Sequence, residues 1–147
     1  MSLLYADTSA LIRAYFADEP QHDFFRVMLL EGTEPVVTSE IARLELASAV
    51  RSAAAGGRLS RWRQLLARMD EDTGERGPVQ LIALRPEAIL PAAYQLILEH
   101  RLRTLDALHL AVALEDTPAI ADGLEIVFIT RDDDQSKAAG NLGFALR

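Results

Sequence analysis

Cysteine is absent from this chain of 147 residues, and so are long apolar runs. Without cysteine the protein can have no disulfide, no thiolate zinc site and no cysteine nucleophile. No apolar stretch reaches the roughly 18 residues that a membrane-spanning helix requires. The first residues also lack the basic and then apolar layout of a secretion signal. Together these absences predict a cytoplasmic protein that does not enter a membrane.

Several common catalytic and nucleotide-binding motifs are missing as well. The chain contains no GxxxxGK[ST] loop and no GxGxxG, which argues against a P-loop and against dinucleotide binding. It has no GxSxG, so an α/β-hydrolase nucleophile is excluded. Its three histidines form no HExxH pair.

Positive charge is also scarce, with 15 basic against 22 acidic residues and a net charge of -7. Nucleic-acid binders are usually basic, and the simplest reason for an acidic balance is solubility. Carboxylates at a metal site would add negative charge that bound cations cancel. All basic residues except Lys137 are arginine, the side chain suited to bidentate phosphate contact.

Apolar runs alternate with helical patterns, which predicts an α/β domain whose central, mainly parallel sheet of four or five strands is flanked by helices. The length fits one domain covering residues 1–147. The predicted strands cover residues 3–6, 35–38, 79–84 and 125–130, with a short one at 144–146. Predicted helices cover about 8–17, 19–32, 39–55, 60–69, 86–101 and 105–115, then 135–141. Residues 117–123, around Pro118, are predicted to form a loop.

Two acidic residues directly follow predicted strands. Asp7 comes after the first strand, and Asp132 after the fourth. In parallel α/β sheets, active sites lie beyond the carboxyl ends of the strands. The sequence therefore predicts both carboxylates on the same rim of the sheet.

Two other carboxylates lie on helix faces that are otherwise apolar. Glu45 shares its face with Ile41 and Ala49, and Asp106 is surrounded by leucines and alanines at helical spacing. Taken singly, each of the four acids has an ordinary explanation: a helix cap or dipole partner for Asp7 and Asp106, a salt bridge for Glu45, and turn chemistry for Asp132.

The four acids indicate a functional site only if their carboxylates lie close together at one rim of the sheet. Four unpaired carboxylates at one rim would repel one another, and some would protonate. A hard cation such as Mg²⁺ or Mn²⁺ prefers oxygen ligands and would relieve the repulsion. Convergence of the four therefore predicts a magnesium or manganese site.

Four short motifs, in order, resemble those of PIN-domain nucleases. They are DTSALI from Asp7, SEIARLEL with Ser39 and Glu45, LDALHLA with Asp106, and FITRD ending at Asp132 and followed by AAGNLG. The resemblance spans nearly the whole chain. The size and the DTSALI start look most like VapC-type toxins of bacterial and archaeal toxin–antitoxin pairs.

This resemblance implies a PIN-like three-layer fold and a metal-dependent endoribonuclease. Such an enzyme would act as the toxin of a type II toxin–antitoxin system, cleaving RNA phosphodiester bonds with a metal-activated water. It further implies restraint by a cognate antitoxin protein and assembly as a homodimer. Mg²⁺ is the expected cofactor, and Mn²⁺ is expected to substitute for it.

The same resemblance carries over to individual residues. The catalytic, metal-binding residues would be Asp7, Glu45, Asp106 and Asp132. Ser9 and Thr130 would support the site. Many relatives have an aromatic residue after the fourth motif, where this chain has Asp133-Asp134-Gln135, so Asp134 competes with Asp132 for the fourth place. Asp132 keeps the spacing from Thr130 and is preferred.

Arginines near these motifs are candidates for RNA binding. Arg131, Arg103 and Arg61 are predicted to contact phosphates, against the alternative of solvated helix faces with local ion pairs. His109, three residues after Asp106, could approach the same site, but a core or partly exposed histidine is the better expectation.

Two rival functions remain open at this point. An acidic rim with Thr130 and Lys137 is also compatible with a phosphate-handling receiver or phosphatase-like domain, although only Asp7 follows the first strand where a receiver would have paired acids. The other rival is a catalytically inactive PIN-like interaction module. The presence of all four carboxylates argues against it.

Overall fold

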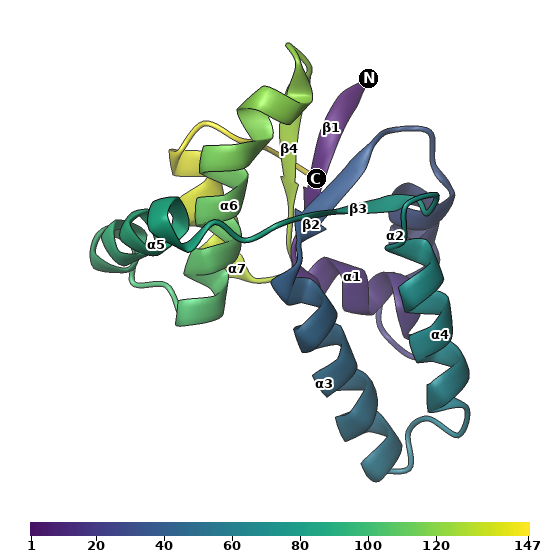
Figure 1. The fold of residues 1–147 in the computed structure, drawn as a ribbon. Coiled ribbons are helices and arrows are strands. Elements are labelled where there is room, and N and C mark those ends of the chain that lie inside the picture. Colours follow the sequence, from purple (N-terminus) through teal and green to yellow (C-terminus); the bar gives the residue numbers. More distant parts are fainter.

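The computed structural model describes residues 1–147 and contains one central sheet of five parallel strands (Figure 1). The strands lie in the order β3-β2-β1-β4-β5. Their bounds are Ser2–Ala6 (β1), Val36–Ser39 (β2), Val79–Ile82 (β3), Glu125–Ile129 (β4) and Ala145–Leu146 (β5). The predicted α/β fold with a mainly parallel sheet is confirmed.

The strand order reverses direction between β1 and β4. The chain moves outward from β1 through β2 to β3, and then crosses back to place β4 on the other side of β1. Such a reversal opens a crevice beyond the carboxyl ends of the two central strands, where α/β proteins bind their ligands. The fold itself therefore marks the ends of β1 and β4 as the place for a site.

Helices cover both faces of the sheet and complete three layers (Figure 1). One face carries α1 (Thr8–Tyr15), α2 (His22–Arg26) with a π-helical turn at Val27–Glu31, α3 (Ile41–Ala55) and α4 (Trp62–Asp72). The other face carries α5 (Pro86–His100), α6 (Thr104–Ala121) and α7 (Asp133–Asn141). None of these helices is both long and apolar enough to span a membrane.

Strand β1 shows why the sheet is buried on both sides. Successive side chains of a strand point to opposite faces. Leu4 and Ala6 accordingly join the core under α1 to α4, and Leu3 and Tyr5 join the core under α5 to α7. The two-sided burial explains why this strand is continuously apolar in sequence instead of alternating.

Helix α6 differs from its prediction at both ends. The predicted loop at 117–123 is wrong, because the helix continues through Pro118 to Ala121. Pro118 is exposed and removes only the one backbone hydrogen bond to Leu114. At its start, Thr104 is already helical, and Arg103 occupies the cap position with an extended backbone (φ -68°, ψ 157°).

Candidate active site

An open pocket of about 410 Å³ lies beyond the carboxyl ends of β1 and β4. Its lining includes all four carboxylates that the sequence singled out: Asp7, Glu45, Asp106 and Asp132. They come from four different segments: the end of β1, helix α3, the first turn of α6, and the turn between β4 and α7. We call this cavity the acidic pocket.

Asp7 is the most deeply buried of the four, with an exposed fraction of 2%. It caps α1: its Oδ1 accepts hydrogen bonds from the backbone N–H of Ala10 (3.0 Å) and from Ser9 Oγ (2.7 Å). Its Oδ2 accepts from Thr130 Oγ1 at 2.6 Å. Burial raises the pKa of Asp7 above the usual aspartate value, against the opposing effects of the Thr130 hydrogen bond and the charge of His109.

Glu45 is held by a hydroxyl and by a buried histidine. Its Oε1 accepts from Thr8 Oγ1 at 2.7 Å and lies 2.6 Å from His109 Nε2. The other ring nitrogen, Nδ1, lies 2.8 Å from the hydroxyl of Tyr5. A proton on Nε2 lets the ring donate to Glu45, while the Tyr5 hydroxyl can donate to or accept from Nδ1. Burial works to raise the pKa of Glu45, but the hydrogen bond and charge of His109 outweigh it and lower that pKa.

Asp106 and Asp132 are held differently, by one exposed guanidinium. Arg103 Nε donates to Asp106 Oδ2 at 2.9 Å, and Arg103 Nη2 donates to Asp132 Oδ2 at 3.1 Å. Asp132 also caps α7, because its Oδ1 accepts from the backbone N–H of Gln135 at 2.8 Å. A single arginine thus bridges the third and fourth acids.

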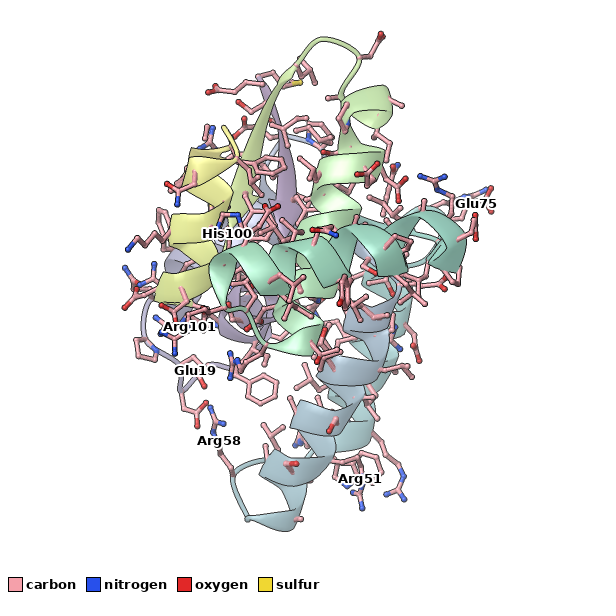
Figure 2. All side chains as sticks on the ribbon, turned by 90° about the vertical axis from the view of Figure 1, so that its left-hand side faces the viewer. Glu19, Arg51, Arg58, Glu75, His100 and Arg101 are labelled. Atoms are coloured by element: carbon pink, nitrogen blue, oxygen red, sulfur yellow. The ribbon has the colours of Figure 1, made fainter.

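The predicted RNA-binding arginines separate into two groups. Arg131 and Arg103 line the acidic pocket, whereas Arg61 does not and lies at the start of α4. Arg13, which the sequence did not single out, lines the pocket as well. The pocket also includes Glu19, but this acid is paired with Arg58 at 2.8 Å (Figure 2).

Asp134 lies outside the acidic pocket. It lines a separate cavity of about 520 Å³ with Lys137, Asn141 and the end of α5, where Figure 2 labels His100 and Arg101. Asp132, not Asp134, therefore shares a pocket with Asp7. Lys137 is likewise not part of the Asp7 pocket, so the lysine that a receiver-like site would place beside the acids is missing there.

Comparison with protein families settles which fold family this is. The PIN domain family model matches residues 4–141. The chain belongs to the PIN domain family. A solved structure described as a toxin-antitoxin complex from Klebsiella pneumoniae is similar in fold, with a TM-score of 0.53 and 21% sequence identity over 97% of this chain and 93% of that one. The chain has no significant match among curated proteins.

The PIN domain site has the donor chemistry for a hard cation, although its side chains are not yet gathered around one. No three acidic or histidine side chains stand in an arrangement that could hold a metal as they are. However, Glu45 receives its hydrogen bonds at Oε1 and Asp106 at Oδ2, which leaves the second oxygen of each carboxylate free. Mg²⁺ keeps several waters and needs few direct carboxylates, so this oxygen-only set fits it.

Two residues that contact the carboxylates of the acidic pocket or their backbone, Thr8 and Gln135, were not singled out from the sequence, and His109 was expected to be a core or partly exposed histidine that could approach the site. Gln135 is fully buried, and its Nε2 donates to the backbone carbonyl of Asp106 at 3.0 Å. His109 lies one helical turn after Asp106, and this spacing indicates that both side chains lie on the same face of α6. The expectation of an ordinary core histidine was right about burial, 1% exposed, but missed its contact with Glu45.

Proposed function

We propose that this PIN domain is a Mg²⁺-dependent endoribonuclease, with Mn²⁺ able to substitute, and that it acts as the toxin of a type II toxin–antitoxin pair. The observation that carries the proposal is the acidic pocket, where four carboxylates from four segments meet at the crevice of the sheet. Members of the PIN domain family are generally nucleases, and this pocket supplies what metal-dependent phosphodiester hydrolysis needs.

In the proposed mechanism, Asp7 and Asp106 would hold the principal cation. Glu45 and Asp132 would hold a second ion or would orient the attacking water by hydrogen bonding. A bound Mg²⁺ lowers the pKa of water and stabilises negative charge on the phosphate. The protein's own part is to fix the carboxylates: Thr130 and Ser9 orient Asp7.

The remaining side chains prepare the other half of the pocket. His109 and Thr8 fix Oε1 of Glu45 and so aim its free Oε2. Arg131 and Arg13 line the pocket, where we propose that they contact phosphate oxygens. The guanidinium of Arg131 lies 5.6 Å from the centre of the Phe25 ring, which supports it without neutralising its charge.

The proposed antitoxin surface is the pair of helices α3 and α4. At the start of α4, the guanidinium groups of Arg51 and Arg63 lie over the Trp62 ring, 4.1 Å and 4.2 Å from its centre. An aromatic side chain with flanking arginines is the composition of interface hot spots. The similar structure from Klebsiella pneumoniae is described as a toxin-antitoxin complex, which is in keeping with a protein partner.

The proposed homodimer would use a row of apolar side chains on α5. Leu90, Tyr94 and Leu98 are spaced by four residues and are 54%, 62% and 61% exposed. Contiguous exposed apolar side chains often mark an interface. Light scattering of the purified protein measures the oligomeric state directly. We propose a cytoplasmic location for the protein.

The test of the nuclease is a cleavage assay on end-labelled RNA, with Mg²⁺ and with EDTA. We expect cutting only with Mg²⁺, and loss of cutting in Asp106→Asn, because the change removes a carboxylate charge and keeps the side-chain shape. The matched control is Asp122→Asn at the opposite end of α6, where asparagine tolerates the left-handed backbone (φ 48°). Cutting in EDTA, or unchanged cutting by Asp106→Asn, would contradict the proposal.

A further inference from the structure

Arg103 occupies an unusual place for a residue expected to bind RNA. Its side chain is 78% exposed, yet both ends of the guanidinium are used within the protein, one on Asp106 and one on Asp132. These are two of the four carboxylates of the acidic pocket. In this arrangement the guanidinium supplies the positive charge that brings the two acids together.

The fold directs Arg103 to this position. Arg103 is the cap residue of α6, and its extended backbone turns the chain from α5 into α6 just before Asp106. Asp132 ends the turn after β4, on the neighbouring strand-to-helix connection. The two acids therefore approach the same guanidinium from two segments that are distant in sequence.

The positive charge of Arg103 acts as a counter-ion for the negative charges of Asp106 and Asp132. Arg103 donates one hydrogen bond to Asp106 and one to Asp132, so its positive charge lies against two carboxylates. A divalent cation ligated by Asp106 and Asp132 would need the same Oδ2 atoms or would lie close to the guanidinium. Because like charges repel over such distances, the arginine and the cation disfavour each other at the two carboxylates, even where the second oxygen of Asp106 is free.

Displacing the arginine should be easy. Exposed ion pairs contribute little, because water screens them and the long side chain loses freedom when it is held. The Arg103 side chain is more exposed than either acid, whose exposed fractions are 18% and 26%. It can therefore swing out into solvent while Asp106 and Asp132 stay in the pocket.

We propose that Arg103 is a resident counter-ion that competes with the divalent cation for Asp106 and Asp132, so that the cation binds only as the guanidinium leaves. This rests on the proposed cation-dependent function. Arg103 sets how tightly the site holds its cation, and in the free protein it keeps two like-charged acids together. Once displaced, the guanidinium stays at the mouth of the pocket, where a substrate phosphate is its natural next partner.

The test is a titration of the whole purified protein with Mn²⁺, followed by calorimetry and without RNA. In Arg103→Gln, which keeps a polar side chain but no charge, we expect the Mn²⁺ affinity to rise about three- to ten-fold. Arg103→Lys, a point charge that cannot bridge both acids in the same way, should fall between wild type and Arg103→Gln.

The matched control is Arg101→Gln, two residues earlier on the same connection. Arg101 lies at the end of α5 (Figure 2) and lines the other cavity with Asp134. The substitution removes the same charge from the same connection, but Arg101 contacts neither Asp106 nor Asp132. We therefore expect no more than a small change in Mn²⁺ affinity. Equal effects of the two variants, or no effect of Arg103→Gln, would overturn the inference and leave the proposed nuclease intact.

A second readout follows Arg103 itself. In wild-type protein titrated with Mg²⁺, the Nε–H signal of Arg103 in an NMR spectrum should shift as the hydrogen bond to Asp106 is lost. The shift should saturate together with cation binding. An unmoved signal at saturating Mg²⁺ overturns the exchange. Absence of any Mn²⁺ or Mg²⁺ binding, in wild type and Arg103→Gln alike, overturns both this inference and the cation dependence of the proposed function.

Discussion

The four carboxylates form two pairs that the fold holds by different means. Asp7 and Glu45, the inner pair, are held by hydroxyl groups, a backbone N–H and a buried histidine ring. Asp106 and Asp132, the outer pair, share the exposed guanidinium of Arg103. The donors to the inner pair belong to α1, to α6 and to Thr130 directly after β4, whereas the side chain that bridges the outer pair is exposed.

This difference separates two tasks of a metal-dependent site. Fixed donors preorganise the inner acids, so little rearrangement is needed when charge arrives. The outer acids stay adjustable and can accept either an arginine or a cation. Substitutions in the inner pair should therefore affect both stability and chemistry, whereas substitutions in the outer pair should affect cation binding, and the cleavage that depends on it, without changing stability.

The largest effect is expected from Asp7→Asn in the inner pair. Loss of one carboxylate ligand removes several kcal/mol of charge stabilisation, so RNA cleavage should fall at least about a thousandfold. The fold should not suffer, since asparagine caps helices as well as aspartate does. Because burial raises the pKa of Asp7, removing the charge should even raise the melting temperature at neutral pH.

The raised pKa of Asp7 also predicts how the melting-temperature difference between Asp7→Asn and wild type changes with pH. A folded-state pKa above the unfolded value means that the contribution of Asp7 to stability is complete in acid and is lost as the pH rises through the raised pKa. The melting-temperature gap between Asp7→Asn and wild type should therefore grow from about pH 4 towards pH 7. Thermal unfolding of both proteins across that range measures it. The other carboxylates are common to both proteins, so a gap that shrinks with rising pH would refute the account.

His109→Leu should have the next largest effect, through Glu45. The change removes the donor at 2.6 Å from Glu45 and leaves the buried Tyr5 hydroxyl without its partner. Loss of an orienting neighbour of a metal ligand typically costs 10–100-fold in affinity or activity, here about 30-fold. Stability should fall by about 1–3 kcal/mol.

A rescue variant separates positioning from folding in this case. His109→Gln restores a donor for Glu45, so its Mn²⁺ affinity should recover further than its stability does. Calorimetry well below the melting temperature measures the first, and urea unfolding the second. If the affinities of the two variants merely track their stabilities, His109 has only a structural role.

The smallest effects are expected at Asp132, the member of the outer pair that is not a proposed ligand of the principal cation. Asp132→Asn keeps the cap on α7 but removes one ligand, and it also frees Arg103 from one of its two partners. Since the weakened arginine competes less, the fall in Mn²⁺ affinity should be only about tenfold, with an unchanged melting temperature. Asp134→Asn should change neither quantity, and a larger effect there than at Asp132 would reverse the assignment of the fourth acid.

The positions of the strand-end acids followed from sequence because they depend on local order. Asp7 and Asp132 each come directly after an apolar strand, and a parallel sheet brings the carboxyl ends of its strands to one edge. Glu45 and Asp106 were found because charge interrupts an apolar helix face. Both signals require only a few neighbouring residues in the chain.

Contacts between distant segments were beyond the reach of the same reasoning. His109 was predicted as a core histidine, since no local pattern shows that the ring lies against Glu45 on another helix. Arg103 was predicted to bind phosphate from its charge, whereas the structure pairs it with two carboxylates. Arg61 has the same charge and yet lies outside the pocket. Charge alone does not show which neighbour a side chain meets.

The hydroxyl of Thr130 has a single hydrogen and three oxygen neighbours that can accept it. Asp7 Oδ2 is 2.6 Å away, Gln135 Oε1 is 3.1 Å away and Ser9 Oγ is 3.2 Å away. An ionised Asp7 takes the hydrogen, whereas a protonated Asp7 can offer its own and let Thr130 turn towards Gln135. The direction of these hydrogen bonds therefore depends on the charge of Asp7. A change in that charge can reach the side-chain amide of Gln135 on α7 through a shift of hydrogen atoms alone.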